Sequence, residues 1–164
     1  MRAQSEGTIV NVSSIAGQDG LPSCGMYAGS KSALEGLSET LARELEPFNI
    51  SVLIVEPGMF RTRFMSAAQI TEKRVSMSYS GGAVEQTLLA FGNLSGTQRG
   101  DPEKAVARIF EVVTGTGAAG ALKGRILRLP LGPDCLARLE KKARSISGDL
   151  ETAREAGMST DFDG

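Results

Sequence analysis

The run from Ile50 to Val55 is the most strongly apolar strand candidate in the chain, and it limits the folds that are open to the sequence. A nearly continuous apolar pattern over the length of a strand predicts burial on both faces, as in a parallel sheet. A second strand is expected at residues 7–13, which are β-branched, apolar and bounded by small residues. Parallel strands need a long crossover between them, so the segment that joins these two runs decides the fold class.

A helical pattern occupies that segment, from about Tyr27 to Pro47, which ends it. Its apolar residues recur at three- and four-residue spacing, as in an amphipathic helix, and its small residues permit close approach of a neighbour. The apolar set is Leu34, Leu37, Leu41 and Leu45, and the small set is Ala28, Gly29 and Gly36. Strand, helix and strand in this order predict one right-handed crossover of an α/β sheet.

The last part of the chain predicts two further helices and a third strand. Asp101 and Pro102 are typical of a helix N-cap and first helical position, and this helix is expected to run to about Val113. A strand is expected at residues 125–129. A charged helix follows, capped by the segment that contains Pro133, and is expected to run to about Ser147.

The length of 164 residues corresponds to one domain, which we expect to span residues 1–164. Between residues 59 and 100 the pattern loosens, with short helical candidates at 66–75 and 84–91. A segment this long between a strand and the next clear helix is more often a binding region than a plain connection, so it is a candidate substrate lid. Two ordinary helices with flexible joints are the alternative. The acidic tail at residues 159–164 is expected to be disordered.

Composition excludes several classes of function. The chain has 18 basic and 19 acidic residues, well mixed, so nothing favours a nucleic acid or a membrane surface as a partner. It has no histidine, and its two cysteines, Cys24 and Cys135, lack the spacing of a metal site. A Ser-His-Asp triad is therefore excluded, and no metal is expected. The first residues lack the apolar core of a signal peptide and no run is long enough to span a membrane, so we expect a soluble, cytoplasmic protein.

The candidate catalytic residues lie at the start of the predicted main helix. Tyr27 and Lys31 are spaced i, i+4, which places both side chains on one face of a helix about one turn apart. A fixed ammonium a few ångströms away favours the phenolate form of a tyrosine, so Tyr27 can pass a proton to or from a substrate oxygen. Ser14 lies thirteen residues upstream of Tyr27, at the mouth of a predicted strand, where its hydroxyl can hold that oxygen.

Three segments in this order and spacing resemble the short-chain dehydrogenase/reductase family. They are Asn11–Gly17 with Ser14, the Tyr27-Ala28-Gly29-Ser30-Lys31 motif, and Glu56–Thr62, which matches the family's Pro-Gly-x-x-x-Thr segment. A lone Tyr-x-x-x-Lys would carry little weight, because helices also use these residues for packing and solvation. The resemblance implies an α/β fold, with this chain forming the C-terminal half of a Rossmann-type doubly wound parallel sheet, three strands with flanking helices.

The resemblance also implies a role for each matching residue. Tyr27 would donate the proton in carbonyl reduction and accept it in alcohol oxidation, while Ser14 binds the substrate oxygen. Lys31 would favour the Tyr27 phenolate and hold the ribose hydroxyls on the nicotinamide side. The cofactor-binding set would be Tyr27, Lys31, Pro57, Gly58 and Thr62. Thr62 has a second, compatible role as the cap of a helix before Phe64.

The family's fold begins with a strand, a Gly-rich turn and a helix that bind the adenosine end of NAD or NADP, and this sequence starts just before the fifth strand. We therefore expect a fragment without the N-terminal cofactor-binding half. NADP is favoured over NAD, although the residue that discriminates between them is absent from the chain. The implied substrate is a small-molecule alcohol, ketone or aldehyde, and the full-length form is expected to be a homo-oligomer. The alternatives are a catalytically inactive truncated form that associates with full-length subunits, and a module with unrelated binding.

A glycine pattern at residues 115–120 spells Gly-x-Gly-x-x-Gly, and Asp134 follows at about the distance that a dinucleotide site would require. That fingerprint works where a strand leads into the glycines and a helix follows, so that backbone N–H groups face the pyrophosphate. Here a predicted helix precedes the glycines and a predicted strand follows them. The segment is therefore predicted to be a flexible helix-to-strand connection.

Overall fold

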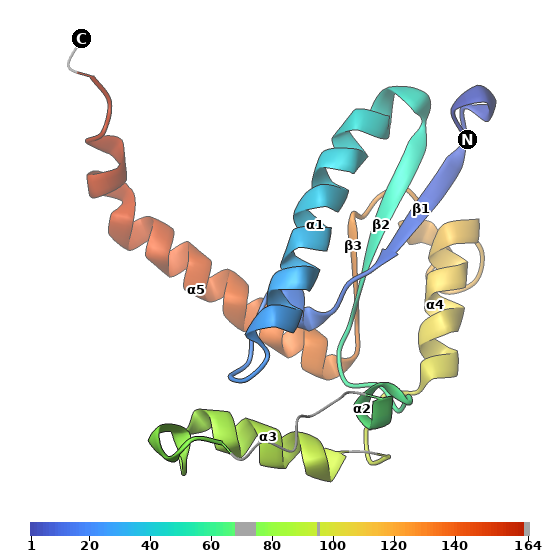
Figure 1. The fold of residues 1–164 in the computed structure, drawn as a ribbon. Helices are drawn as coiled ribbons and strands as arrows, with labels where there is room; N and C mark the ends of the chain where they lie inside the picture. Colours follow the sequence, from blue (N-terminus) through green and yellow to red (C-terminus); the bar gives the residue numbers. More distant parts are fainter. Residues whose placement is uncertain (68–74, 95, 163–164) are drawn as a thin grey trace.

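Three parallel strands form one sheet in the order β1-β2-β3, with helix α1 on one face and helix α4 on the other (Figure 1). The structure is a computed structural model, and it describes residues 1–67, 75–94 and 96–162. The strands are β1 Gly7–Val12, β2 Ile50–Pro57 and β3 Arg128–Leu131. The α/β prediction is confirmed, because a helix connects β1 to the parallel strand β2.

Strand β2 is central because its side chains are apolar on both faces. Leu53 and Val55 lie in a buried cluster on one face, to which α4 contributes Val112. Ile50 and Val52 lie on the other face, in a cluster with α1. A strand with two apolar faces can be buried only where helices cover both, which is the arrangement that Figure 1 shows.

Helix α1 spans Gly25–Leu45 and is followed by a short 3-10 turn, Glu46–Phe48, which contains Pro47. The predicted apolar stripe describes its buried face only in part. Leu45 is buried, but Leu37 is 70% exposed, and a Cβ added at Gly29 or Gly36 would meet no atom within 4 Å. Within the described residues no neighbour approaches closely at these glycines, and polar residues of α1 occupy part of the face toward the sheet. Asn11 Nδ2 of β1 donates to Ser38 Oγ of α1 at 2.8 Å.

The other elements follow the predicted order. They are η1 Arg2–Gln4, η2 Ile15–Gly17, α2 Phe64–Ala67, η4 Met77–Tyr79, α3 Ala83–Leu94, α4 Pro102–Thr114, η5 Gly120–Leu122 and α5 Pro133–Met158. Helix α3 confirms the candidate at 84–91, whereas much of the candidate at 66–75 lies outside the described residues. The prediction that the last helix ends near Ser147 was wrong, because the helical segment continues through Gly148 to Met158.

The third strand begins three residues later than predicted, at Arg128 instead of residue 125. Gly124 has a positive φ of 66°, and Arg125 N donates to Leu122 O, so residue 125 belongs to a turn. The register with β2 starts where Arg128 pairs with Ile54. Pro130 is tolerated in β3 because this strand lies at an edge of the three-stranded sheet.

The glycines at residues 115–120 form a connection and not a phosphate loop. Gly115 is the C-cap of α4 in the left-handed conformation, with φ 78°, and its N–H donates to Glu111 O. A Cβ added at Gly120 would lie 2.7 Å from Gly115 O, so the chain folds back on itself here. Helix α4 precedes these glycines and β3 follows them, which confirms the predicted order.

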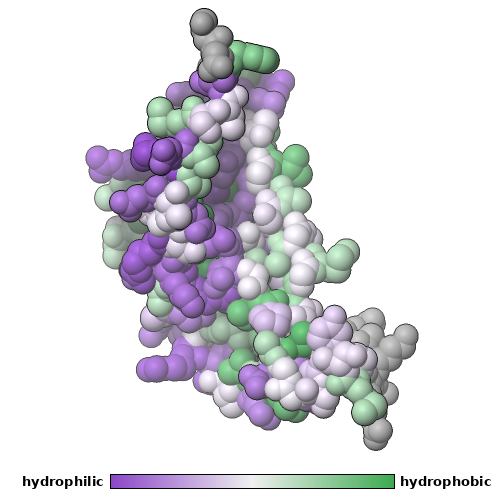
Figure 2. All heavy atoms as spheres, turned by 90° about the vertical axis from the view of Figure 1, so that its left-hand side faces the viewer, coloured by the Kyte–Doolittle hydropathy of each residue, from purple (hydrophilic) through white to green (hydrophobic). Residues whose placement is uncertain are grey.

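Helix α5 is attached to the sheet only through its first turns. Cys135 is fully buried and its Sγ donates to Glu56 O at 3.0 Å, and burial raises the pKa of this thiol to about 11. From Glu140 to Phe162 every residue is exposed, and the helix runs away from the sheet (Figure 1). Figure 2 shows this side of the molecule, where strongly hydrophilic residues cover much of the left of the view and hydrophobic residues gather in its lower part. No helix in the described residues has the length and hydropathy that crossing a membrane requires.

Candidate active site

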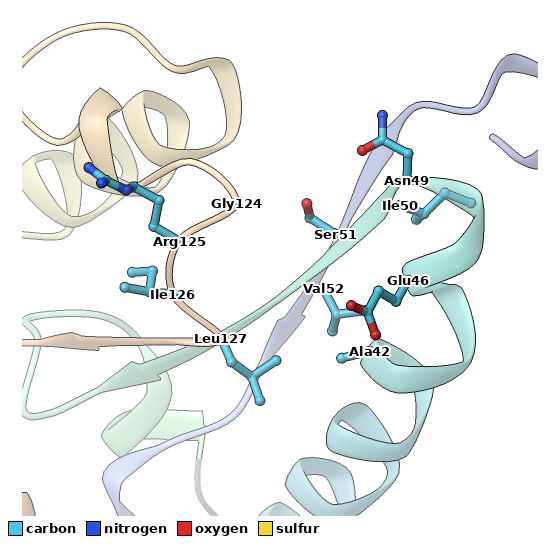
Figure 3. Close-up of a pocket in the computed structure, with 10 residues that line it drawn as sticks. All are labelled: Ala42, Glu46, Asn49, Ile50, Ser51, Val52, Gly124, Arg125, Ile126 and Leu127. Atoms are coloured by element: carbon cyan, nitrogen blue, oxygen red, sulfur yellow. The ribbon is translucent and has the colours of Figure 1, made fainter.

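The candidate site lies at the carboxyl ends of the parallel strands. Strand β1 leads directly into Ser13 and Ser14, and β2 ends at Pro57, before Gly58. Ligands of open α/β sheets bind at this edge. A hollow between the end of α1, the start of β2 and residues 124–127 lies at the opposite edge, among the residues labelled in Figure 3. Its position at the amino ends of the strands argues against a catalytic role.

The structure brings Tyr27 and Lys31 together at the start of α1. Lys31 Nζ lies 5.8 Å from the centroid of the Tyr27 ring, as the i, i+4 spacing predicts. Nζ also donates to Val12 O, the last residue of β1, at 3.0 Å. This bond ties the helix to the end of the strand that carries Ser14. The Tyr27 ring also contacts Phe64 of α2, with ring centroids 5.6 Å apart and planes tilted by 49°.

Ser14 lies two residues beyond β1 and is partly buried. Its Oγ accepts a hydrogen bond from Ala16 N at 3.2 Å and so caps the 3-10 turn η2. A hydroxyl that accepts from the backbone still has its own hydrogen to donate, so this capping role leaves Ser14 able to bind a substrate oxygen.

The three residues expected to position the nicotinamide lie at the end of β2 and just beyond it: Pro57 is its last residue, and Gly58 and Thr62 follow. Gly58 N donates to Leu131 O at 2.8 Å, and a Cβ at this position would lie 2.6 Å from Asp134 Cγ. Glycine is therefore required here because the Asp134 carboxylate occupies the space, where its Oδ2 also accepts from Met59 N at 2.8 Å. Thr62 Oγ1 accepts from Phe64 N at 3.2 Å, which confirms its predicted capping contact at the start of α2.

A group of buried polar residues that the sequence did not predict lies against the Ser13–Gln18 segment. Glu35 and Glu56 are 3% and 0% exposed, and both contact Arg128 of β3 and Gln18 of the η2 region. Burial and the neighbouring Glu35 raise the pKa of Glu56 to about 7, against the lowering effects of Arg128 and Gln18. A glutamate one helical turn after Lys31 is typical of a solvated helix surface. Nothing in the sequence except the charges of Glu35, Glu56 and Arg128 therefore indicates that these residues meet in the interior.

Relatives of the chain are oxidoreductases. A family model described as short chain dehydrogenase matches residues 1–73. The oxidoreductase BOA17 of Botryotinia fuckeliana is 32% identical over 161 residues, which cover 98% of this chain and 55% of that protein. An uncharacterized oxidoreductase of Bacillus subtilis, YusZ, is 36% identical over 109 residues, 65% of this chain and 38% of YusZ.

Solved structures have the same arrangement of strands and helices. A short-chain dehydrogenase from Streptomyces avermitilis matches with a TM-score of 0.77 and 34% identity, covering 98% of this chain and 55% of that one. The chain belongs to the short-chain dehydrogenase/reductase family. A family structure from Burkholderia phymatum, determined in complex with NAD, shares the fold at 20% identity and a TM-score of 0.68, over 91% of this chain and 51% of that one.

Membership of the short-chain dehydrogenase/reductase family confirms the family, the fold class and, at the level of the family, an oxidoreductase. The chain spans about half the length of the relatives it matches, 55% of BOA17 and 38% of YusZ. The site residues are therefore placed by the geometry above, while their catalytic roles belong to the proposal that follows.

Proposed function

We propose that this chain carries the catalytic and substrate-binding part of an NAD(P)-dependent oxidoreductase that interconverts an alcohol and a ketone or aldehyde. The observation that carries the proposal is the position of Lys31, whose ammonium lies beside the Tyr27 ring and is bonded to Val12 O at the end of β1. One side chain thus connects the tyrosine to the strand end from which Ser14 emerges. That is the arrangement needed to bind a substrate oxygen and transfer its proton.

In this mechanism Tyr27 gives its phenolic proton to the carbonyl oxygen during reduction and takes it from the hydroxyl during oxidation. Ser14 donates a hydrogen bond to the same oxygen and holds it in place. The Lys31 charge stabilises the phenolate that remains after transfer, because the ammonium is held beside the ring by Val12 O. Phe64 contacts the Tyr27 ring and so limits its movement.

The residues present fit the nicotinamide end of a dinucleotide. Lys31 has three N–H donors and Val12 O accepts one, so Nζ can also hold ribose hydroxyls. Pro57, Gly58 and Thr62 lie at the same edge of the sheet and would contact the carboxamide and the adjoining phosphate. When bound, the nicotinamide supplies or accepts the hydride. NADP remains favoured over NAD in this proposal, and the NAD-bound relative supports a nicotinamide cofactor in general.

Oxidation of NADPH and NADH by the protein at its full native length, with a panel of ketones and aldehydes, tests the proposal. Tyr27→Phe should abolish turnover, because phenylalanine keeps the ring but has no proton to transfer, and Lys31→Met should lower kcat by roughly the 10²-fold or more that general acid–base catalysis contributes. The matched control is Lys141→Met, on the exposed part of α5, which should leave turnover unchanged. Circular dichroism checks that each variant is folded, and full activity in folded Tyr27→Phe would refute the assignment.

The alternative function is a catalytically inactive form that acts only by associating with full-length subunits, and it rests on the chain spanning about half of its relatives. The intact mass of the native protein, captured through a peptide that contains Tyr27, separates the two. A species well above the 17.2 kDa of this chain supports the enzyme, and a short form without turnover supports the alternative.

The same proposal extends to the rest of the chain and to the full-length protein. Residues 1–164 form a single domain that is part of a longer family fold, and residues 59–100, which contain α2 and α3, act as a lid over the substrate. The predicted disorder of the tail at 159–164 stays a prediction, and residues 163–164 lie outside the described residues. The full-length protein is a cytoplasmic homo-oligomer.

A further inference from the structure

Two buried glutamates share one arginine behind the candidate site. Glu35 comes from α1, Glu56 is the last residue but one of β2, and both side chains are buried. Arg128 Nε of β3 lies 3.5 Å from Glu35 Oε2 and 3.3 Å from Glu56 Oε1, while its Nη2 bonds Glu39. A single guanidinium therefore serves three carboxyl groups, two of them buried. Two ionised carboxylates in one dry site with a shared cation are strongly disfavoured.

The two buried carboxyl groups receive unequal hydrogen bonds. Glu35 Oε1 accepts from Ser13 Oγ at 2.7 Å, and Glu35 Oε2 accepts from Gln18 Nε2. Glu56 Oε1 has only longer contacts, to Gln18 Nε2 at 3.5 Å and to Arg128. Glu56 Oε2 is buried and has no hydrogen-bond partner in the described part of the chain. The carboxyl group with the poorer donors is the one that takes up a proton.

We propose that Glu56 carries a proton on Oε2 and donates it to the Glu35 carboxylate, and that this pair positions the Ser14 segment against α1. The proposal deepens the proposed function and rests on it for the importance of Ser14. The same Glu35 carboxylate bonds Ser13 and Gln18, which lie on either side of Ser14. Gly17 completes the enclosure, since a Cβ there would overlap that carboxylate.

Glu35 of the pair lies on α1, the same helix that carries Tyr27 and Lys31. Glu35 follows Lys31 by one helical turn and Tyr27 by two, on the same side of α1. A shift of the Glu35 carboxylate would therefore move the Ser13–Gln18 segment relative to Tyr27 and Lys31. Glu35 and Glu56 act on the reaction through Ser14 and are positioning residues.

Other charged groups border the pair from each element around it. Helix α1 contributes Glu39 and strand β3 contributes Arg128. Asp19, beyond η2, is neutralised by Arg138 of α5, whose Nε donates to Asp19 Oδ2 at 2.7 Å. Asp134 of α5 faces away, toward Met59 N. Among these charged groups, Arg128 is therefore the cation that neutralises the two buried carboxyl groups, and it also forms an ion pair with Glu39. When pH rises past about 7, where burial and Glu35 place the pKa of Glu56, the proton is lost and the pair repels.

Infrared spectroscopy detects the shared proton directly, because a protonated carboxyl group has a carbonyl stretch well separated from that of a carboxylate. In the whole chain we expect such a band that disappears as pH is raised from about 6 to about 9, because carboxyl groups with an ordinary pKa of about 4 are already ionised at about pH 6. Glu56→Gln should remove the band, and its amide can still donate to Glu35. The matched control Glu44→Gln, on the exposed side of α1, should retain it. A missing band in the wild type, or a band that survives in Glu56→Gln, would overturn the proposal.

Amide NMR tests whether the glutamate pair positions the Ser14 segment, and it requires no enzyme turnover. In the wild type the amide resonances of Ser13–Gln18 should shift with pH around the same midpoint as the infrared band, and in Glu56→Gln they should be pH-independent over that range. Insensitive wild-type amides would overturn the coupling to Ser14. Glu35→Gln is the second variant, and it should move the midpoint of the band to lower pH because it removes the charge that raises the pKa of Glu56. The infrared and NMR measurements need no substrate. An inactive enzyme would therefore refute the proposed function but not the shared proton.

Discussion

Gly17 shows how closely the chain approaches itself at the residue scale. A Cβ at this position would overlap the Glu35 carboxylate and lie 3.1 Å from Ser13 Oγ. Moving the Glu35 carboxylate away would cost free energy, because it accepts hydrogen bonds from Ser13 and Gln18. The side chain of residue 17 is therefore limited to a single hydrogen for steric reasons.

We predict that Gly17→Ala lowers the free energy of unfolding by about 1–3 kcal/mol, the usual range for overpacking a site that cannot relax. Urea denaturation measures the change. The control is Gly36→Ala on α1, where an added Cβ meets nothing within 4 Å and helix propensity favours alanine by up to about 1 kcal/mol. Equal effects of the two substitutions would contradict the steric explanation.

Glu56 makes stability depend on pH in a direction opposite to that of most carboxylates. Its pKa rises from 4.5 to about 7 on folding, chiefly through burial, so the folded state holds the proton more tightly than the unfolded state does. The stabilisation is therefore fully present below about pH 4.5 and is lost as pH rises through about 7.

We predict that the free energy of unfolding of the wild type falls relative to that of Glu56→Gln by about 1.4 kcal/mol per pH unit in that window. Comparing the two proteins removes the contribution of the other titrating groups. Parallel pH dependence in wild type and variant would show that Glu56 gains no proton on folding.

The sequence predicted Tyr27 and Lys31 correctly as neighbours because i, i+4 spacing on a helix determines proximity without any tertiary information. The sequence did not predict that Glu35 and Ser38 point into the interior, because their burial depends on tertiary contacts. Hydrophobic periodicity places polar residues on the outer face, whereas the burial of these two side chains is favoured by partners distant in the sequence, among them Ser13 for Glu35 and Asn11 for Ser38.

At the scale of elements, α4 illustrates structure that local signals determine. Asp101 Oδ1 accepts from Glu103 N at 2.9 Å and from Lys104 N at 3.3 Å, and Pro102 occupies the first turn. The predicted start of this helix is confirmed, because a cap and a proline depend only on adjacent residues. The start of β3 depended instead on a turn at Gly124 and on pairing with β2, so it could not be located from its own residues.

We predict that Asp101→Ala destabilises the protein by about 1 kcal/mol, because two backbone N–H groups of α4 lose their acceptor. Asp101→Asn keeps an acceptor oxygen at the same place and should retain most of the stability. Thermal denaturation of both variants gives the comparison. If the two variants unfold alike, the cap contributes nothing beyond its charge.

At the scale of the whole molecule, α5 has two parts with different energetic roles. Its first turns are bound to the sheet and to the site, through Cys135 to Glu56 O, Asp134 to Met59 N and Arg138 to Asp19. The part beyond Glu140 has no buried residue and therefore contributes no apolar burial to the fold. A helix without tertiary contacts depends on its intrinsic propensity, and Gly148 lowers that propensity in its middle.

We therefore predict that ending the chain after Ser147 changes the free energy of unfolding by no more than about 0.5 kcal/mol, as for other surface changes, while the helical circular dichroism signal falls. Ending it after Cys135 should instead unfold the chain, because Arg138 is lost and the first turn of α5 no longer closes over Glu56. Denaturation followed by near-ultraviolet and far-ultraviolet signals separates the two effects. A large loss of stability on removing residues 148–164, together with a change in sedimentation, would mean that the exposed Leu150 and its neighbours are covered in solution by a second copy of the chain.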